Sequence, residues 1–321
     1  MTLNQRINKL LLQSQAVHLQ AQARTEREVK RMYARANDRF AAIALKGNAL
    51  SERSVTFAAM DKVMQELSDK VADRIERARV QSISAAIAGE RAVVDRIREV
   101  SRKKKRVKEA EEKPAKLSVL GDPLDEMSFS FVFDRITPDV IAAMRSDSKG
   151  IELSTRIWDI DRMSLQQMKN YMAEYALTEE SQSFVYQFVK GFLTLPDVDM
   201  RKKIWKEYFK ENPPGRGVYR SAWKNAMRVI RTETNNAFRK AQAEFGKKEP
   251  WVKGVRWVLS GAHPADDECD GYASADEYGL GAGVYPADAL PDSHPQCLCH
   301  LEYVVDYEGL GLPAELGEEP A

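Results

Sequence analysis

The chain has 321 residues, of which 43% are hydrophobic and 30% are charged, and its formal net charge is +1. This apolar content is low for one compact globule, and it favours an elongated, helix-rich protein of two or three domains. No run approaches about 18 apolar residues, and the first residues do not resemble a secretory signal. We therefore expect neither a membrane span nor export, and we expect the protein in a reducing cytoplasm.

The near-zero net charge hides a difference between the two ends of the chain. Residues 1–113 carry 25 Lys or Arg against 15 Asp or Glu, whereas residues 257–321 carry 14 Asp or Glu and no Lys or Arg. A basic end and an acidic end are expected to meet different partners. The basic end suits nucleic acid, which would repel the acidic end unless a metal or a protein offsets its charge.

Residues 1–113 are predicted to form a basic helical arm, because no proline precedes Pro114 and helix-forming residues dominate. Apolar residues recur in three- and four-residue steps over 60–78, and a second set follows over 83–100 after a phase shift near Gly89. A break is expected at 46–48. The pattern indicates a coiled-coil-like helical hairpin rather than a sustained zipper, and it offers a surface for self-association.

Five consecutive cations lie near the end of this arm: Arg102, Lys103, Lys104, Lys105 and Arg106. Each could neutralise one phosphate, but no aromatic residues stand between them to stack on bases. Contact with double-stranded DNA here would therefore be sequence-independent and sensitive to salt. A solvated linker or helix end is the simpler interpretation, and a localisation signal is a third.

Residues 114–217 are predicted to form a helical domain with one strand-like segment. The segment 127–133 alternates apolar and polar residues, and Thr137-Pro138 is a typical helix start. Further helices are expected over 164–176, 179–194 and 197–211. The run Asn212-Pro213-Pro214-Gly215 ends this domain.

Residues 218–305 are predicted to form a separate module, followed by an acidic flexible tail over 306–321. A helix is expected over 218–245, strands over 252–259 and 298–305, and an ordered loop over 260–295. The predicted fold is thus mainly α, with a long N-terminal helical arm, a central helical domain and a small α+β Cys/His-rich C-terminal module. Trp223 and Trp257 are expected to be core anchors.

The cysteines and histidines are concentrated in this module. All three cysteines and three of the four histidines lie between His263 and His300. Zn²⁺ prefers four nitrogen or sulfur ligands in a tetrahedral arrangement, which Cys269, Cys297 and Cys299 could provide with either His263 or His294. One residue separates Cys297 from Cys299, and joint binding by their two thiolates is expected to need a turn, which Pro295 could help to place.

Other chemistries are compatible with the same residues. The thiols could remain reduced without a metal, or two of them could form a disulfide. The carboxylates of Asp266, Asp267 and Asp270 could instead bind a hard cation, although such loops are usually only solvated. The sequence alone leaves these alternatives open.

Several motifs occur in a characteristic order. Arg231-Thr232-Glu233-Thr234 lies in an Ala-rich helix and is followed by a strand with Trp257, the segment 266–270, the Gly-rich segment 279–286 and His294-Pro295-Gln296-Cys297-Leu298-Cys299. This order resembles the Mu F-like head morphogenesis, or minor capsid, proteins of tailed phages. The resemblance covers about residues 138–305. The chain departs from the family where relatives often have a second cysteine close to the position of Cys269, and we expect His263 to be the fourth ligand.

The resemblance implies a low-copy protein inside the capsid, near the portal protein, that aids procapsid assembly and DNA packaging or delivery. Its expected partners are portal, capsid or scaffold proteins, and its expected location is the virion and, during assembly, the host cytoplasm. Arg231 and Glu233 are candidates for fixing the helix against the Cys/His module, although they could equally be two surface charges. Trp257 belongs to the same motif.

Two other classes of function remain. His263, Asp266, Asp267 and His294 could supply a metal and a general base to a nuclease-like hydrolase. Against an enzyme, residues 257–321 lack a cation to hold a phosphate, and the chain has no Gly-rich phosphate loop or HExxH motif. The third class is a purely scaffolding adaptor. We expect a structural protein rather than an enzyme.

Overall fold

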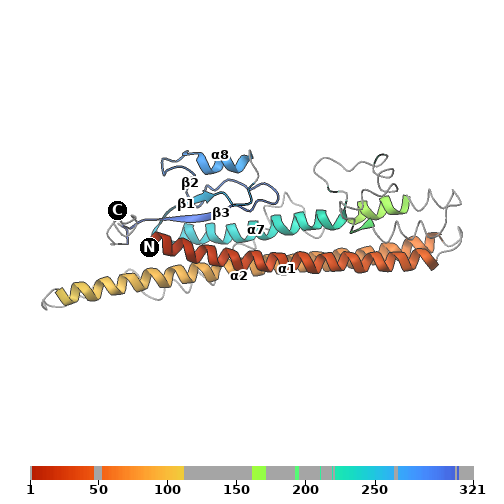
Figure 1. Ribbon diagram of the computed structural model, residues 1–321, viewed down its shortest axis with the longest axis horizontal. Coiled ribbons are helices and arrows are strands. Elements are labelled where there is room, and N and C mark those ends of the chain that lie inside the picture. Colours follow the sequence, from red (N-terminus) through yellow and green to blue (C-terminus); the bar gives the residue numbers. More distant parts are fainter. Residues whose placement is uncertain are drawn as a thin grey trace. The chain divides into compact units, whose positions relative to one another are not determined.

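The structure, a computed structural model, describes residues 2–46, 53–111, 161–170, 192–194, 210, 219, 221–263, 267–307 and 309–310, except the side chains of 44–46, 53–54 and 104–111. Within these residues the fold is mainly helical, with a long N-terminal helical arm and a small C-terminal module that contains the strands (Figure 1). This confirms the predicted fold class. The helices in these ranges include none with the length and apolar content needed to cross a membrane.

Three long helices make up most of the described chain: α1 (Leu3–Lys46), α2 (Arg53–Glu111) and α7 (Ala222–Lys248). A reciprocal cap starts α1, because Thr2 Oγ1 accepts the Gln5 amide N–H at 3.1 Å and Gln5 Oε1 accepts the Thr2 amide N–H at 2.9 Å. α1 ends at Lys46 and α2 begins at Arg53, and of the break predicted at 46–48 only Lys46 lies within the described residues. Two lysines in the last turn of α7 suit the negative end of the helix dipole, and Pro250 follows two residues after Lys248.

α2 passes through Gly89 without a break. A side chain at this position would bring its Cβ within 2.5 Å of Ser14 Cβ on α1. Ser14 Oγ also donates a hydrogen bond to the carbonyl oxygen of Ala85 at 2.5 Å. The phase shift in the apolar pattern therefore marks a close contact between α1 and α2 and not an interruption of the helix.

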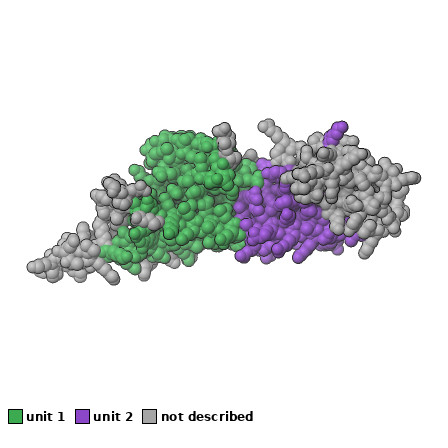
Figure 2. Space-filling view, viewed as in Figure 1, with its two compact units in different colours: residues 1–21, 79–146, 232–321 green, residues 22–78, 147–231 purple. Residues whose placement is uncertain are grey.

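The chain divides into two compact units (Figure 2). Unit 1 contains residues 1–21, 79–146 and 232–321, and unit 2 contains residues 22–78 and 147–231. Each of the three long helices contributes one part to each unit. The units consequently differ from the predicted consecutive domains, because apolar faces from distant parts of the chain bury one another.

Unit 2 has a helical core. The apolar stripe predicted over 60–78 is buried in it, together with side chains from α1, from the start of α7 and from Leu165, Met168, Phe192 and Leu193. Asp161 is buried as well, and its carboxylate accepts hydrogen bonds from Tyr33 Oη at 2.7 Å and Ser68 Oγ at 2.6 Å. Burial raises the pKa of Asp161 to about 6.

Unit 1 contains a three-stranded antiparallel sheet whose central strand is β1 (Val252–Val258), with β2 (Val284–Tyr285) and β3 (His300–Val305) on its two sides. Alternate residues of β3 are buried, as expected for a strand with one covered face. The covered face joins one apolar core with parts of α1, α2 and α7. Phe245, Trp251 and Tyr303 pack ring to ring in this core.

The predicted helix over 218–245 and the predicted strands over 252–259 and 298–305 are confirmed, with shifts of a few residues at their ends. The predicted loop over 260–295 contains two elements that the sequence did not indicate, α8 (Glu268–Ser274) and β2. Residues 161–170 are helical. The predictions for 127–133, for the helix starting at Pro138 and for most of 179–211 and of the tail over 306–321 lie outside the described residues.

Candidate metal centre

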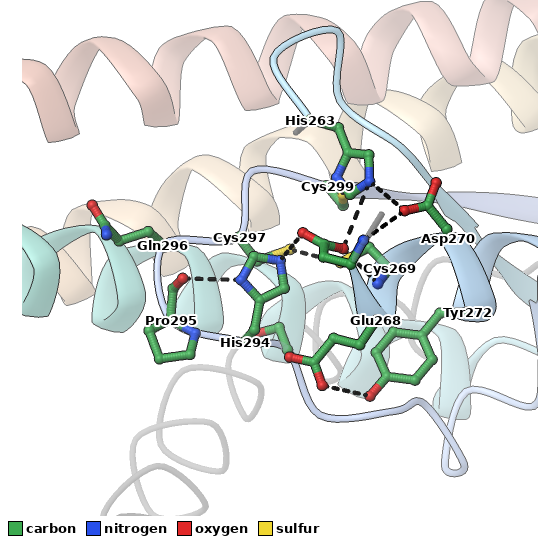
Figure 3. A network of polar contacts seen from close by, with 12 residues as sticks. His263, Glu268, Cys269, Asp270, Tyr272, His294, Pro295, Gln296, Cys297 and Cys299 are labelled. Carbon is green, nitrogen blue, oxygen red and sulfur yellow. Dashed lines mark hydrogen bonds and ion pairs between the residues drawn. The ribbon is translucent and has the colours of Figure 1, made fainter. Parts of the chain in front are cut away.

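Five residues of unit 1 meet in one place although up to 36 positions separate them along the chain. Cys269 lies on α8, His263 precedes that helix, and His294, Cys297 and Cys299 precede β3. Their side chains converge in Figure 3. All three cysteines are buried, with free thiols. The sequence prediction named these five residues, and the structure brings them together.

Two groups of three ligand atoms are close enough to share an ion. His263, Cys269 and Cys299 form one group, and Cys269, His294 and Cys297 form the other, with all ligand atoms of a group within 4.8 Å of one another. The Sγ atoms of Cys269 and Cys297 are 3.6 Å apart, and Cys299 Sγ is 3.9 Å from His263 Nδ1. The sulfur–sulfur distance is far longer than a disulfide bond of about 2.05 Å.

A tight turn precedes the two closely spaced cysteines. The amide N–H of Cys297 donates to the carbonyl oxygen of His294 at 3.2 Å, and Gln296 has a φ of 66°. Proline at the second position and a positive φ at the third are typical of a type II turn. The turn predicted at Pro295 is thus present, and it lies before Cys297 rather than between the two cysteines.

A capping box positions Cys269. Asp267 is the N-cap of α8 and accepts the Cys269 amide N–H at 2.7 Å, while Asp270 Oδ2 accepts the Asp267 amide N–H at 3.0 Å. The same two carboxylates face the histidines. Asp270 Oδ2 is 3.0 Å from His263 Nε2, and Asp267 Oδ2 is 3.3 Å from His294 Nε2.

Hydrogen bonds orient both imidazoles for binding a cation. Nε2 of His263 donates to Asp270, which leaves Nδ1 with its lone pair facing Cys299, and the same bond raises the pKa of His263. Nδ1 of His294 donates to the carbonyl oxygen of Pro295 at 3.0 Å. Its Nε2 makes no hydrogen bond with the described residues, lies 3.3 Å from Asp267 Oδ2, and belongs to the group of candidate ligand atoms with Cys269 and Cys297.

The sulfur atoms have unequal affinities for protons. A hydrogen bond from Cys299, together with the nearby Arg239 guanidinium, lowers the pKa of Cys297 to about 5. Burial and the neighbouring Cys297 raise the pKa of Cys269 to about 12, and the hydrogen bond with Cys297 and burial raise that of Cys299. The cluster thus favours one thiolate, and a bound cation would replace the protons of the other two thiols.

Helix α7 holds the segment 293–299 through Thr232 of the RTE motif and through two residues to which the sequence analysis gave no role, Asn235 and Arg239. Thr232 Oγ1 accepts the Gln296 amide N–H at 3.1 Å, and Asn235 Nδ2 donates to the Cys297 carbonyl oxygen at 2.6 Å. Arg239 donates to the Cys299 carbonyl oxygen at 2.9 Å. These side chains recur at three- and four-residue steps, which place them on one face of α7. This spacing is the sequence signal by which they could have been found.

The motif residues nearby have other partners. Arg231 pairs with Glu26 of α1 within unit 2, with Nε 2.6 Å from Oε1. Glu233 lies 3.8 Å from Arg79 of α2 within unit 1. Trp257 is buried on β1, against the ring of Tyr272 and below the guanidinium of Arg239. Trp257 thus contacts the guanidinium that holds the Cys/His segment.

The remaining site predictions have separate outcomes. His263, Asp267 and Asp270 form a third group of candidate ligand atoms, partly open to solvent, and Asp266 lies outside the described residues. Arg102 and Lys103 are exposed on α2, and Lys103 pairs with Glu99 at 2.7 Å. The side chains of Lys104, Lys105 and Arg106 lie outside the described part of the molecule.

No protein-family model, no curated protein and no solved structure matches this chain. What the chain does is therefore argued from its motifs and from the geometry of this centre.

Proposed function

We propose that the C-terminal module is held together by one structural Zn²⁺, and that the chain is a minor capsid or head morphogenesis protein of a tailed phage. The observation that carries the first part is the convergence of three buried sulfurs and two oriented imidazoles from segments far apart in sequence. The second part rests on the motif order described above.

Zinc suits these donors better than a hard cation does. Thiolate and imidazole ligands favour Zn²⁺, whereas Mg²⁺ and Ca²⁺ take oxygen ligands. Four protein ligands define a structural zinc site, while a catalytic site keeps a position for water. We assign Cys269, Cys297, Cys299 and His263 as the ligands. His263 is favoured over His294 because its hydrogen bond to Asp270 fixes the tautomer and strengthens the imidazole as a donor.

Metal analysis of the full-length chain tests this proposal. Protein purified under reducing conditions is expected to contain about one equivalent of zinc, and each of the variants Cys269→Ser, Cys297→Ser and Cys299→Ser to lose most of it. His300→Gln is the matched control, since this histidine lies in the same module outside the cluster. Less than about 0.2 equivalents in the unaltered protein, with three titratable thiols, would contradict a structural zinc.

The fourth ligand is tested by two further variants. His263→Gln is expected to weaken zinc binding by about 10- to 100-fold, and His294→Gln by clearly less. The reverse order would make His294 the ligand. Equal and negligible effects of both would contradict coordination by any histidine.

The phage-head role is supported by the RTE helix, the HPQCLC segment and the basic helical arm. In this role the chain lies inside the head near the portal protein, contacts portal, capsid or scaffold proteins, and can touch packaged DNA through its cations. Immunodetection in purified procapsids and mature particles of the encoding phage tests it. We expect a few copies per particle that resist washing with high salt, and absence from both particles would contradict the role.

A nuclease-like hydrolase is the second candidate, favoured by the partly open group of His263, Asp267 and Asp270. We propose instead that these carboxylates orient histidines and cap α8. Incubation with DNA and Mg²⁺ or Zn²⁺ separates the two functions. We expect no cleavage, whereas cleavage that His294→Ala abolishes would establish the enzyme.

A further inference from the structure

We propose that Arg239 is a positioning residue of the metal centre, which supplies the counter-charge to its thiolates and fixes the backbone on either side of them. This inference rests on the proposed zinc site. It identifies a residue on α7, outside the Cys/His segment, that sets the affinity for the ion.

The charge balance of the site requires a cation from elsewhere in the fold. Three thiolates and one neutral imidazole around a divalent ion leave one net negative charge. Residues 257–321 contain no Lys or Arg. The segment that carries the four ligands therefore cannot offset this charge with a lysine or arginine of its own, and burial makes an uncompensated charge costly.

Arg239 lies where this charge is needed. Its side chain is 8% exposed, and Nη1 is 3.5 Å from Cys297 Sγ. Within the described part of the chain its hydrogen bonds go to carbonyl, hydroxyl and amide oxygens and to this sulfur, and to no carboxylate. Since buried arginines are normally paired with an anion, the thiolates are the anion that this structure offers.

The guanidinium also holds the backbone of the site. Nη1 donates to the carbonyl oxygen of Cys299 at 2.9 Å and lies 3.4 Å from that of Cys297. Nη2 donates to Ser293 Oγ at 2.6 Å and to Asn236 Oδ1 at 2.9 Å. The planar guanidinium thus binds the segment from Ser293, before the turn, to Cys299. A lysine, with a single ammonium group, could make only some of these hydrogen bonds.

Zinc affinity of the full-length protein, measured by competition with a chromophoric chelator, tests the proposal. Arg239→Met is expected to weaken binding by about 10- to 100-fold, and Arg239→Lys by less, because it keeps the charge and loses the fork. Arg256→Met is the matched control, since it removes an exposed cation from β1 of the same module. Its affinity is expected to equal that of the unaltered chain.

The outcomes separate this inference from the zinc site itself. An unaltered protein without zinc refutes the proposed function, whereas zinc-binding protein with an unaffected Arg239→Met variant refutes only the role of Arg239. Equal losses of zinc affinity in Arg239→Met and Arg239→Lys would contradict the proposal that the positive charge of Arg239 balances the thiolates. In Co²⁺-substituted protein, the thiolate charge-transfer band is expected to keep its intensity in Arg239→Met, because the ligands are unchanged.

If Arg239→Met does not fold, a second pair of variants tests whether the guanidinium of Arg239 supplies the counter-charge. Ser293→Asp places a carboxylate beside Nη2, where it competes with the thiolates for the guanidinium, and Ser293→Asn has nearly the same shape without the charge. We expect the Asp variant to bind zinc about tenfold more weakly than the Asn variant. Equal affinities of these two variants would overturn the proposal.

Discussion

At the scale of single residues, a chain of hydrogen bonds connects the helices of unit 1 to the candidate metal centre. Asn235 Nδ2 donates to the Cys297 carbonyl oxygen, so its Oδ1 is an acceptor and receives a hydrogen bond from His18 Nε2 at 2.7 Å. Nδ1 of His18 then accepts from Ser82 Oγ at 3.0 Å. His18 is therefore neutral, with one defined tautomer, and it stacks on Phe238.

This arrangement predicts acid sensitivity. Burial lowers the pKa of His18 from 6.5 to about 4, so below pH 6.5 the unfolded chain takes up a proton that the folded chain does not. The contribution of neutral His18 to the free energy of unfolding is complete above pH 6.5 and decreases as the pH falls towards 4. Between pH 7.5 and 4.5 the unaltered protein should lose about 2–3 kcal/mol more unfolding free energy than His18→Gln. Equal losses in denaturant titrations would contradict a buried neutral His18.

Gly89 gives a steric prediction. Alanine normally favours a helix by about 1 kcal/mol over glycine, but here its Cβ would overlap Ser14 Cβ. Gly89→Ala is therefore expected to destabilise the protein by about 1–3 kcal/mol. Ser14→Gly removes the opposing atom, so the double variant should show a favourable coupling energy in thermal unfolding. Strictly additive effects would show that the helices do not touch at this point.

At the scale of elements, Tyr303 joins α2, α7 and β3. Its hydroxyl lies 2.7 Å from Glu90 Oε1 and 2.8 Å from the carbonyl oxygen of Gln242. One hydroxyl hydrogen cannot serve both acceptors. A protonated Glu90 resolves this by donating to the Tyr303 oxygen, and burial raises the pKa of Glu90 well above its usual value.

Glu90→Gln is therefore expected to stabilise the protein. A carboxyl whose pKa is raised on folding contributes stability below its unfolded pKa, and this contribution is lost as the pH rises through its folded value. The amide keeps the hydrogen bond and cannot ionise. We expect a gain of about 1 kcal/mol or more at pH 8 and a smaller gain at pH 5, measured by unfolding at both values. A loss of stability at pH 8 would contradict a protonated Glu90.

The elements of the C-terminal module were predictable where their signals are local. The strands around Trp257 and Tyr303 have apolar alternation, and the helix with the RTE motif has clear periodicity. α8 escaped prediction because it has seven residues, contains Gly271 and is capped by Asp267 and Asp270 rather than by the usual Ser or Thr with Glu. The five candidate ligands followed from composition. Arg239 did not, since only the fold brings it to Cys297 from 58 positions away.

At the scale of the whole molecule, the compact units could not be read from the order of the sequence. Composition shifts near 113 and 217 suggested consecutive domains, whereas α1, α2 and α7 each take part in both units. Periodicity shows which face of a helix is apolar. It does not show which distant face covers it, and that pairing defines the units.

The charge difference between the two ends of the chain predicts that the basic N-terminal part contacts the phosphates of DNA. If the cations at 102–106 contact phosphates, Arg102→Gln/Lys103→Gln should reduce the slope of log affinity against log salt by about 1.8. Lys247→Gln/Lys248→Gln, which removes two exposed cations at the end of α7, is the matched control and should leave the slope nearly unchanged. Weak binding that does not depend on salt in the unaltered chain would contradict a DNA role.

The central claim is that three cysteines and one histidine bind one zinc ion that holds the C-terminal module together. X-ray absorption at the zinc edge, on full-length protein purified under reducing conditions, tests it most directly. We predict a first shell of three sulfurs at about 2.3 Å and one nitrogen at about 2.0–2.1 Å. A shell of oxygen and nitrogen alone, or protein without stoichiometric zinc, would contradict the claim.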